Sequence, residues 1–277
     1  MLSRVIISLV RISSFVLLIP VLFMGCESSS VLKKVLIIQD ELPQIEVLAE
    51  FLRERGGMEV VVVDQEDLPS DFSPFSAVIG FIHGDLKIPT EKAIIDYTLR
   101  GGRHIVLHHT ISSGKAENEF YFDFLGIRLD NPAESSDPVE PGGGYGWRHV
   151  PVLTLVNLNP QHYIINHKVN WGEEIPYTPS DFPSAEGLYP SLTLESSEVY
   201  LNHKYTDGRE KTVLMGLKYF DDRNQVLFMQ DRAGWIKRAG KGDIIYLLPG
   251  HEPSDYENRN ISQMVLNAVN WVRQSDE

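Results

Sequence analysis

The first hundred residues alternate short apolar runs with amphipathic segments, and this alternation limits the fold more than any other feature. Two amphipathic segments, Leu42–Arg55 and Ile88–Leu99, have the apolar spacing of helices, and each is followed by a Gly-Gly pair. The apolar runs resemble buried strands and cover Lys34–Gln39, Glu59–Val63, Ala77–Ile82 and His104–His108. Because strands joined by helical crossovers pair in parallel, this order predicts a parallel α/β sheet with helices on both faces.

The second half of the chain predicts antiparallel additions to that sheet. A surface loop is expected over Asn131–Gly146, where Pro, Gly and Ser are frequent. A closing helix is expected over Arg259–Val272. The predicted strands are Val150–Val156, Glu198–His203, Thr212–Tyr219, Asn224–Met229 and Asp243–Leu248. No linker and no internal repeat divides the chain, so we predict a single α/β domain over residues 34–274.

Composition excludes several classes of function. Lys and Arg number 25 against 38 Asp and Glu, for a formal charge of −13, whereas a nucleic-acid partner requires a basic face. A single Cys excludes a disulfide framework and a cysteine-based zinc site. Neither a dinucleotide-binding glycine motif nor a phosphate-binding loop is present, so no nucleotide cofactor is expected.

The N-terminal segment predicts export and lipid anchoring. The apolar stretch Ile12–Met24 has the length of a signal-peptide core, and Gly25-Cys26 follows it. This arrangement resembles the bacterial lipoprotein signal, although Phe23 stands where Leu is usual. It implies that residues 1–25 are removed, that Cys26 is lipidated and that residues 26–33 form a polar tether. The protein would then face outward from a membrane of the bacterial cell envelope. An uncleaved anchor, or a signal peptide with an incidental Cys, remains an alternative.

Histidines follow several of the predicted strands. Asp40 follows the first strand, His83 the third, His108 and His109 the fourth, and His251 the late strand. In parallel α/β sheets ligands bind beyond the carboxyl ends of the strands. We therefore expect a functional site at this edge of the sheet.

Three segments carry a resemblance to a known family. Gly101–His108 resembles a glycine-rich strand that ends in the letters GLH, and Glu198–Tyr200 resembles a DExY segment. Trp235 with Gly240–His251 resembles a longer signature that ends in LGH. Over about residues 34–272 the chain is thus similar to the ThuA-like (trehalose utilisation) family. The resemblance implies a flavodoxin-like sheet of the class I glutamine amidotransferase-like fold, with antiparallel elaborations.

Some positions depart from the family pattern or from the wider fold. Ser197 stands where Asp is usual, Asp243 replaces an Arg, and Gln39-Asp40 replaces a turn that often contains His. The position of the amidotransferase nucleophile falls at or next to His108, and the only thiol is that of Cys26. Glutamine hydrolysis by a thiolate is therefore excluded.

Four residues are the predicted catalytic set: His108, Glu198, Tyr200 and His251. The two histidines end buried strands, where an imidazole can transfer protons near neutral pH or bind a metal. Strand alternation places Glu198 and Tyr200 on one face, where a carboxylate and a phenol suit proton transfer on a sugar. The same alternation predicts that His109 points away from His108.

A zinc ion is a further expectation. His83, His108, His149 and His251 would bind it together with Glu198, since zinc accepts imidazole and carboxylate ligands. No closely spaced histidine pair on a helix supports this set, so every ligand would come from a separate segment. His162 also lies near a histidine position of the family.

Other residues are expected to contact a substrate. Trp147 and Arg238 are the first candidates, with Lys241 beside Arg238. Aromatic rings in the loop-rich middle would stack on sugar faces, and they include Tyr145, Trp171, Tyr177, Phe182 and Tyr189.

The resemblance implies a carbohydrate role, because the family is associated with disaccharide use and with oxidised (3-keto) sugars. We expect an enzyme that acts on such a sugar by acid–base chemistry, with a metal or a histidine polarising the carbonyl. A non-catalytic sugar-binding lipoprotein and a metal-dependent hydrolase remain alternatives.

Overall fold

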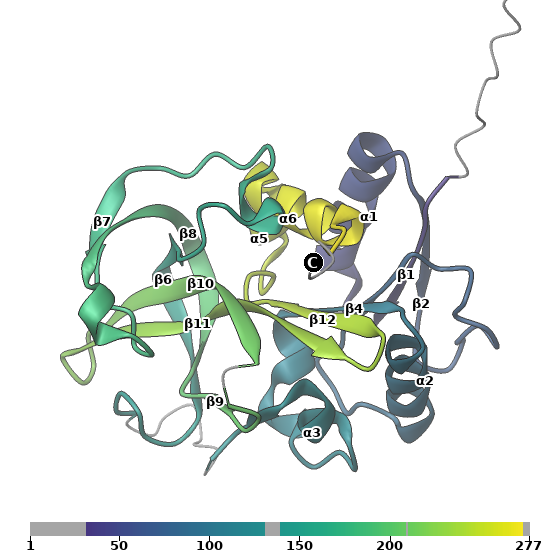
Figure 1. The fold of residues 1–277 in the computed structure, drawn as a ribbon, viewed down its shortest axis with the longest axis horizontal. Helices are drawn as coiled ribbons and strands as arrows, with labels where there is room; N and C mark the ends of the chain where they lie inside the picture. The colour runs from purple at the N-terminus through teal and green to yellow at the C-terminus, as the bar shows by residue number, and fades with distance from the viewer. Residues whose placement is uncertain (1–31, 131–138, 209, 274–277) are drawn as a thin grey trace, which may run out of the picture. The chain divides into compact units, whose positions relative to one another are not determined.

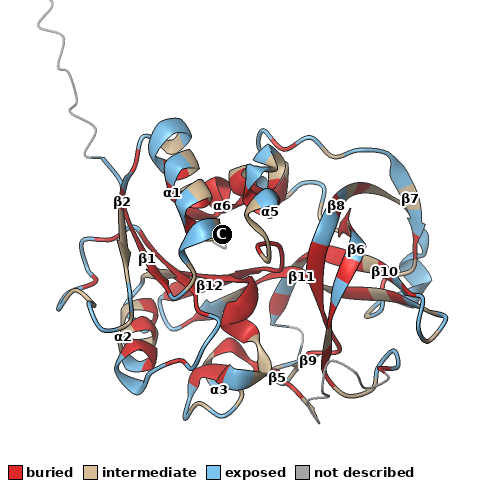
Figure 2. Ribbon diagram, turned by 180° about the vertical axis from the view of Figure 1, so that it is seen from behind, coloured by how far each residue is buried: buried red, intermediate tan, exposed pale blue. Residues whose placement is uncertain are grey.

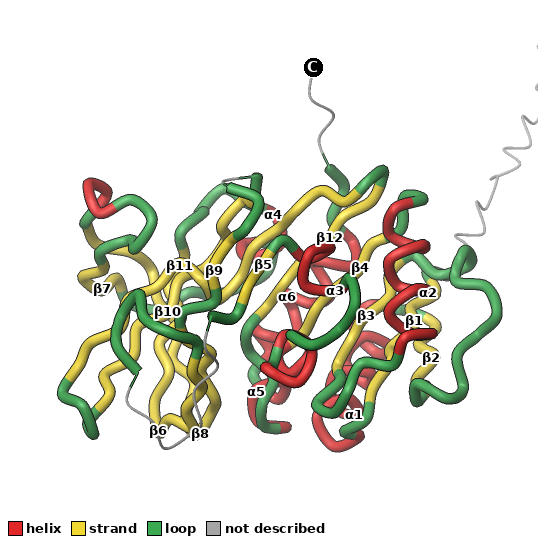
Figure 3. The backbone as a smooth tube through the Cα atoms, turned by 90° about the horizontal axis from the view of Figure 1, so that it is seen from below, coloured by secondary structure: helices red, strands yellow, loops and turns green. Residues whose placement is uncertain are grey.

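A ten-stranded sheet runs through the protein, with β2 and β7 at its two edges (Figure 1, Figure 3). The computed structural model describes residues 32–130, 139–208 and 210–273. The strand order is β2-β1-β3-β4-β12-β11-β10-β6-β8-β7. Within the described residues, no helix has both the length and the apolar character that a membrane crossing requires.

The first half of the sheet is parallel. Its strands are β1 (Lys34–Gln39), β2 (Glu59–Val63), β3 (Ala77–Phe81), β4 (Arg103–Leu107) and β12 (Gly242–Leu247). The order β2-β1-β3-β4-β12 is the flavodoxin-like order, in which the chain reverses direction across the sheet between β1 and β3. This confirms the predicted fold class. Figure 2 shows β1 and β12 in the colour of buried residues.

The second half of the sheet is antiparallel and begins where β11 pairs with β12. Its strands are β11 (Val226–Ala239), β10 (Lys211–Asp221), β6 (Gly146–Asn157), β8 (Gly187–Leu201) and β7 (Glu174–Tyr177). The pairing of β10 with β11 shifts register at two places, between Val213 and Leu217. A separate two-stranded sheet joins β5 (Ile127–Arg128) to β9 (Lys204–Tyr205).

Helices cover both faces of the parallel half (Figure 1). One face carries α1 (Leu42–Gly56), α5 (Pro253–Glu257) and α6 (Arg259–Asn270), which contact one another. The other face carries α2 (Ile88–Leu99) and α3 (Tyr121–Leu125), while α4 (Tyr163–Asn166) packs against α6. The sequence dictates α1 directly: Pro43 lies in its first turn, and its buried stripe includes Ile45 and Leu52. Gly57 ends it with a φ of 59°, a conformation that costs glycine little.

The predicted elements agree best with the structure in the parallel half. There, α2 has the predicted bounds, and the strands differ by a residue at most at either end. In the antiparallel half β8 and β11 are far longer than predicted. Exposed residues interrupt the apolar pattern in the added part of β8, and the buried polar residues Gln230 and Asp231 interrupt it in β11. Of the predicted loop Asn131–Gly146, residues 131–138 lie outside the described residues, and β6 already begins at Gly146.

Candidate functional site

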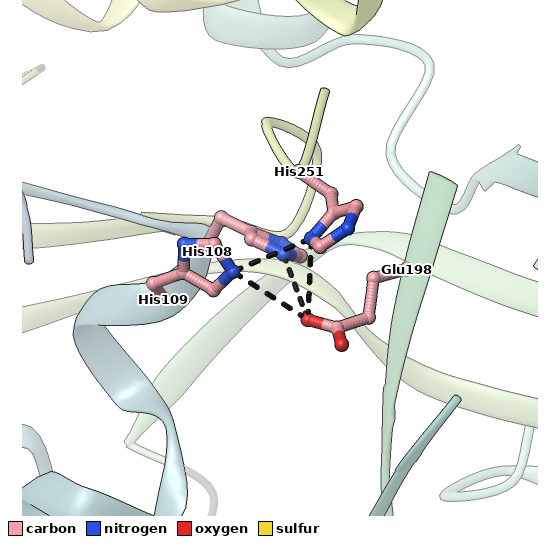
Figure 4. Close-up of side chains that lie close together, drawn as sticks. All are labelled: His108, His109, Glu198 and His251. Atoms are coloured by element: carbon pink, nitrogen blue, oxygen red, sulfur yellow. Dashed lines mark hydrogen bonds and ion pairs between the residues drawn. The ribbon is translucent and has the colours of Figure 1, made fainter. Parts of the chain in front are cut away.

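Four side chains converge at the carboxyl edge of the parallel half: His108, His109, Glu198 and His251 (Figure 4). Two strands of this half supply the imidazoles, since His108 and His109 follow β4 and His251 follows β12. Glu198 comes from β8 in the antiparallel half. All but His251, which is half-buried, are buried from solvent. The cluster therefore joins the two halves of the sheet, and we call it the His/Glu cluster.

The turn after β4 explains why neighbouring histidines share one site. β4 ends at Leu107, and a 3-10 helix covers His108–Ile111. His108 has a φ of 38°, in the left-handed region that side chains other than glycine rarely adopt. Strand alternation ends at this residue, so the prediction that His109 points away is wrong: the two rings lie 4.4 Å apart. Strained backbone of this kind costs about 1–3 kcal/mol and is frequent at functional sites.

The hydrogen bonds of His108 define the state of its ring. Nδ1–H donates to the carbonyl oxygen of Leu248 at 2.6 Å, since a carbonyl can only accept. Nε2 lies 3.1 Å from Oε2 of Glu198. In a neutral ring with its proton on Nδ1, Nε2 presents a lone pair, and so does the ionised carboxylate. This contact therefore requires a positive species between the two atoms, either a proton or a metal ion.

His109 and His251 direct further nitrogens toward the same point. Nε2 of His109 lies 3.3 Å from Nδ1 of His251, and these atoms lie 3.7 Å and 3.6 Å from Oε2 of Glu198. Burial and the neighbouring imidazoles lower the pKa of His109 far below its ordinary value. Burial also lowers the pKa of His251. Both lowered pKa values favour the neutral form of these rings.

Glu198 stays ionised although it is buried. Burial alone would raise its pKa, but the hydrogen bond and electrostatic interaction with His108, with smaller effects of His251 and Tyr200, outweigh burial and lower it. Tyr200, two residues along β8, stacks its ring on that of His108 with centroids 4.8 Å apart. Burial and the charge of Glu198 raise the pKa of Tyr200 well above its ordinary value, so its phenol remains protonated.

A buried carboxylate holds the turn that carries His251. Oδ2 of Asp255 accepts from the backbone N–H groups of Gly250 at 3.0 Å and His251 at 2.9 Å. It also accepts from the hydroxyl of Ser197 at 2.9 Å, and Ser197 precedes Glu198 on β8. One carboxylate thus fixes the positions of His251 and of the strand that carries Glu198.

An open pocket of about 300 Å³ leads to the cluster. Its lining includes the aromatic residues Tyr145, Trp147 and Tyr200, together with Ser112 and Ser113. His149 lines it as well: its side chain is 63% exposed, and its Nε2 lies 3.9 Å from Oε1 of Glu198. The pocket is therefore open to solvent, whereas the cluster behind it is buried.

Residues 33–272 match the family described as trehalose utilisation. The chain belongs to the ThuA family. This membership gives it a carbohydrate-related role and confirms the resemblance in its strand-end segments. None of the curated proteins matches the sequence.

Solved structures share this fold at low sequence identity. A ThuA-like protein from Bacteroides uniformis has a TM-score of 0.51 and 15% identity, over 85% of this chain and 89% of that protein. A cold-adapted β-galactosidase from Rahnella also has a TM-score of 0.51, at 13% identity. That match covers 86% of this chain but only 31% of the galactosidase. A glutamine amidotransferase from Thermotoga maritima has a TM-score of 0.46 and 9% identity, over 86% of this chain and 96% of that one.

The predicted metal ligands divide into two groups. His108 and His251 lie in the His/Glu cluster, whereas His83 and His149 lie beside it. His83, 60% exposed, stacks on His109 with centroids 4.3 Å apart, and its Nδ1 donates to Glu41 at 2.8 Å. His149 lies at the pocket mouth.

Sequence reasoning missed Glu41 as a member of this site. Its other carboxylate oxygen, Oε2, lies 2.9 Å from Nδ1 of His109. Glu41 follows β1 at the point where the strand order reverses, and this position could have indicated it.

Other predicted residues lie away from this pocket. Arg238 and Lys241 belong to the β11–β12 hairpin, at the end of β12 opposite His251, so the predicted substrate contact of Arg238 is not supported. His162 caps α4, where its ring accepts from the N–H of Ile164. Four of the predicted sugar-stacking aromatics do not line the pocket: Trp171, Tyr177, Phe182 and Tyr189.

Proposed function

We propose that this ThuA-family protein is an enzyme that removes a proton from the carbon beside the carbonyl of an oxidised (3-keto) sugar. The observation that carries the proposal is the ionised Glu198 at the inner end of an aromatic-walled pocket. A ketone makes the neighbouring C–H acidic, so a positioned base is the main requirement of such a reaction. Aromatic rings such as Trp147 suit the apolar face of a pyranose.

Glu198 and His149 are the proposed proton-accepting pair. Oε1 of Glu198 faces Nε2 of His149, and the exposed ring of His149 can exchange protons with solvent. The proton leaves carbon and passes to this pair, which leaves an enolate. The enolate either takes a proton back at another carbon, as in isomerisation, or expels a glycosidic oxygen that receives a proton, as in elimination. Either course needs no further reactant.

The test is exchange of carbon-bound hydrogen with deuterated solvent, followed by NMR on a 3-keto disaccharide. The protein should catalyse exchange beside the carbonyl, and Glu198→Gln should reduce the rate at least ~100-fold, the usual contribution of a general base. Glu195→Gln changes an exposed carboxylate on the same strand and is the matched control. Unchanged exchange in Glu198→Gln would remove Glu198 from the mechanism.

Sugar binding without catalysis is the competing outcome. It would appear as saturable binding of the keto sugar with no exchange above the rate in buffer. The proton-transfer proposal would then be wrong for this substrate class.

We further propose that the protein is tethered to a membrane of the bacterial cell envelope through a lipid on Cys26, with the pocket outside the cytoplasm. Residues 1–31 lie outside the described residues, so the support is the sequence pattern Gly25-Cys26. Globomycin, which blocks lipoprotein signal peptidase, should leave an unprocessed precursor. Normal processing under the drug would contradict this proposal.

A further inference from the structure

We propose that the His/Glu cluster binds one divalent transition-metal ion of the zinc class. The ligand atoms are Nε2 of His108, Nε2 of His109, Nδ1 of His251 and Oε2 of Glu198. The inference builds on the site in which the proposed function is placed. It adds a Lewis acid to that site, and the experiments below separate the two claims.

The distances between the ligand atoms match a tetrahedral zinc site. Zinc–nitrogen and zinc–oxygen bonds of about 2.0–2.1 Å place tetrahedral ligand atoms about 3.3 Å from one another. Here the carboxylate oxygen lies 3.1, 3.7 and 3.6 Å from the three imidazole nitrogens. Two of those nitrogens, from His109 and His251, lie 3.3 Å apart. All four atoms lie within 4.8 Å of one another.

Ring nitrogens and a carboxylate oxygen face one another across the cluster, and such groups need a cation between them. Nδ1 of His108 contacts the carbonyl oxygen of Leu248, which leaves Nε2 directed at Glu198. His109 and His251 approach each other through ring nitrogens. A divalent ion at the centre would satisfy all four lone pairs at once. A shared proton would satisfy only one pair.

The second ring nitrogen of His108 is hydrogen-bonded, and those of His109 and His251 each lie near a carboxylate. His108 donates through Nδ1 to the carbonyl of Leu248. Nδ1 of His109 lies 2.9 Å from Glu41, and Nε2 of His251 lies 3.6 Å from Glu252. Metal-binding histidines usually direct their second nitrogen to a carboxylate or carbonyl, which fixes the tautomer and raises ligand basicity.

The donor set selects the kind of ion. Three imidazoles and one carboxylate suit zinc and its neighbours in the first transition series, whereas magnesium and calcium prefer oxygen ligands. Glu198 binds through Oε2, so Oε1 still faces His149 and the proton-accepting pair is preserved. Four protein ligands fill a tetrahedral shell, so the ion would polarise the sugar carbonyl only by accepting it as a fifth ligand.

The test measures metal content by elemental mass spectrometry on the full chain, purified without a histidine tag and dialysed against zinc. We expect about one zinc per chain in the wild type and at least a tenfold loss in His109→Ala. His167→Ala removes an exposed histidine outside the cluster and should keep the wild-type content. Circular dichroism would check that each variant is folded. Cobalt in place of zinc should give the strong visible absorption of tetrahedral Co²⁺, which His109→Ala should lack.

A conservative variant tests the outer partner. Glu41→Gln should keep the fold and weaken zinc affinity about 10- to 100-fold, the usual effect of losing such a partner. The inference would be overturned if the wild type holds no zinc, or if His109→Ala keeps the zinc content of the wild type. Full hydrogen exchange on keto sugars by chelator-treated, metal-free protein would overturn the Lewis-acid role of the ion and leave the proposed function standing. Stoichiometric zinc without any hydrogen exchange would support the metal site and refute the proposed function.

Discussion

The two halves of the sheet contribute different chemistry to one site. The parallel half supplies imidazoles on the turns that follow its strands, as His108 and His251 show. The antiparallel half supplies a carboxylate from within a long strand, Glu198 on β8, and most of the aromatic pocket wall. Neither half alone holds both the imidazoles and the carboxylate of the site. The comparison teaches that the parallel half provides the positions common to its fold, while the antiparallel addition determines what those positions can do.

The largest expected effect comes from cutting the link between the halves at Asp255. Asp255→Ala would leave two buried N–H groups and the hydroxyl of Ser197 without their acceptor. We expect a loss of about 4–5 kcal/mol in the free energy of unfolding, measured by urea titration, because three hydrogen bonds to a charged group are lost and each contributes about 1.5–3 kcal/mol. Glu257→Ala, an exposed change on the same helix, is the control. Equal stability of the two variants would mean that the turn and β8 are positioned independently.

An intermediate effect on stability is expected at His104, which lies on β4 four residues before His108. Its ring is fully buried, contacts the carbonyl of Val78 and the hydroxyl of Tyr121, and lies outside the His/Glu cluster. Burial lowers its pKa from 6.5 to about 4. The unfolded chain therefore binds a proton here more readily than the folded chain, so stability falls as pH decreases from 6.5 toward 4.

The change that tests this is His104→Gln. Between pH 7 and pH 4 the free energy of unfolding of the wild type should fall by up to about 3 kcal/mol more than that of the variant. Each pKa unit corresponds to about 1.36 kcal/mol. Hydrogen exchange per folded molecule should be unchanged. If hydrogen exchange falls while the fold persists, His104 contributes to the functional site and is not merely structural.

The smallest effect on stability is expected in the β11–β12 hairpin, at the end of β12 opposite His251. Arg238→Ala should alter stability by less than about 0.5 kcal/mol, because this side chain is exposed in a hairpin. Hydrogen exchange should also match the wild type. A weakened affinity for the keto sugar would show that the substrate contact predicted from the sequence exists despite this distance.

The sequence predicted the parallel half well because its signals are local. Continuous apolar runs define β1, β3 and β4, and the strand-end rule indicated His108 and His251 before any geometry was available. The family resemblance added Glu198 and Tyr200, which do share the pocket.

What the sequence could not provide depends on geometry between distant segments. His109 enters the cluster because one backbone angle at His108 ends the strand alternation. Glu41 reaches His109 only through the neighbouring ends of β1, β3 and β4. Arg238 lies beside the sequence signature that ends in His251, but the length of β12 separates them. Residues adjacent in a motif can thus lie at opposite ends of one strand.

The late position of β12 in the chain has a consequence for biosynthesis. This strand lies between β4 and β11, and the bond from His108 to Leu248 spans 140 residues. Until β12 has been synthesised, β4 and β11 each present an unpaired edge, which favours aggregation. Contacts of such long range also slow folding. A chain that stops before residue 242 would therefore be an aggregation-prone fragment rather than a weakened form of the protein, and the site can form only after nearly the whole chain exists.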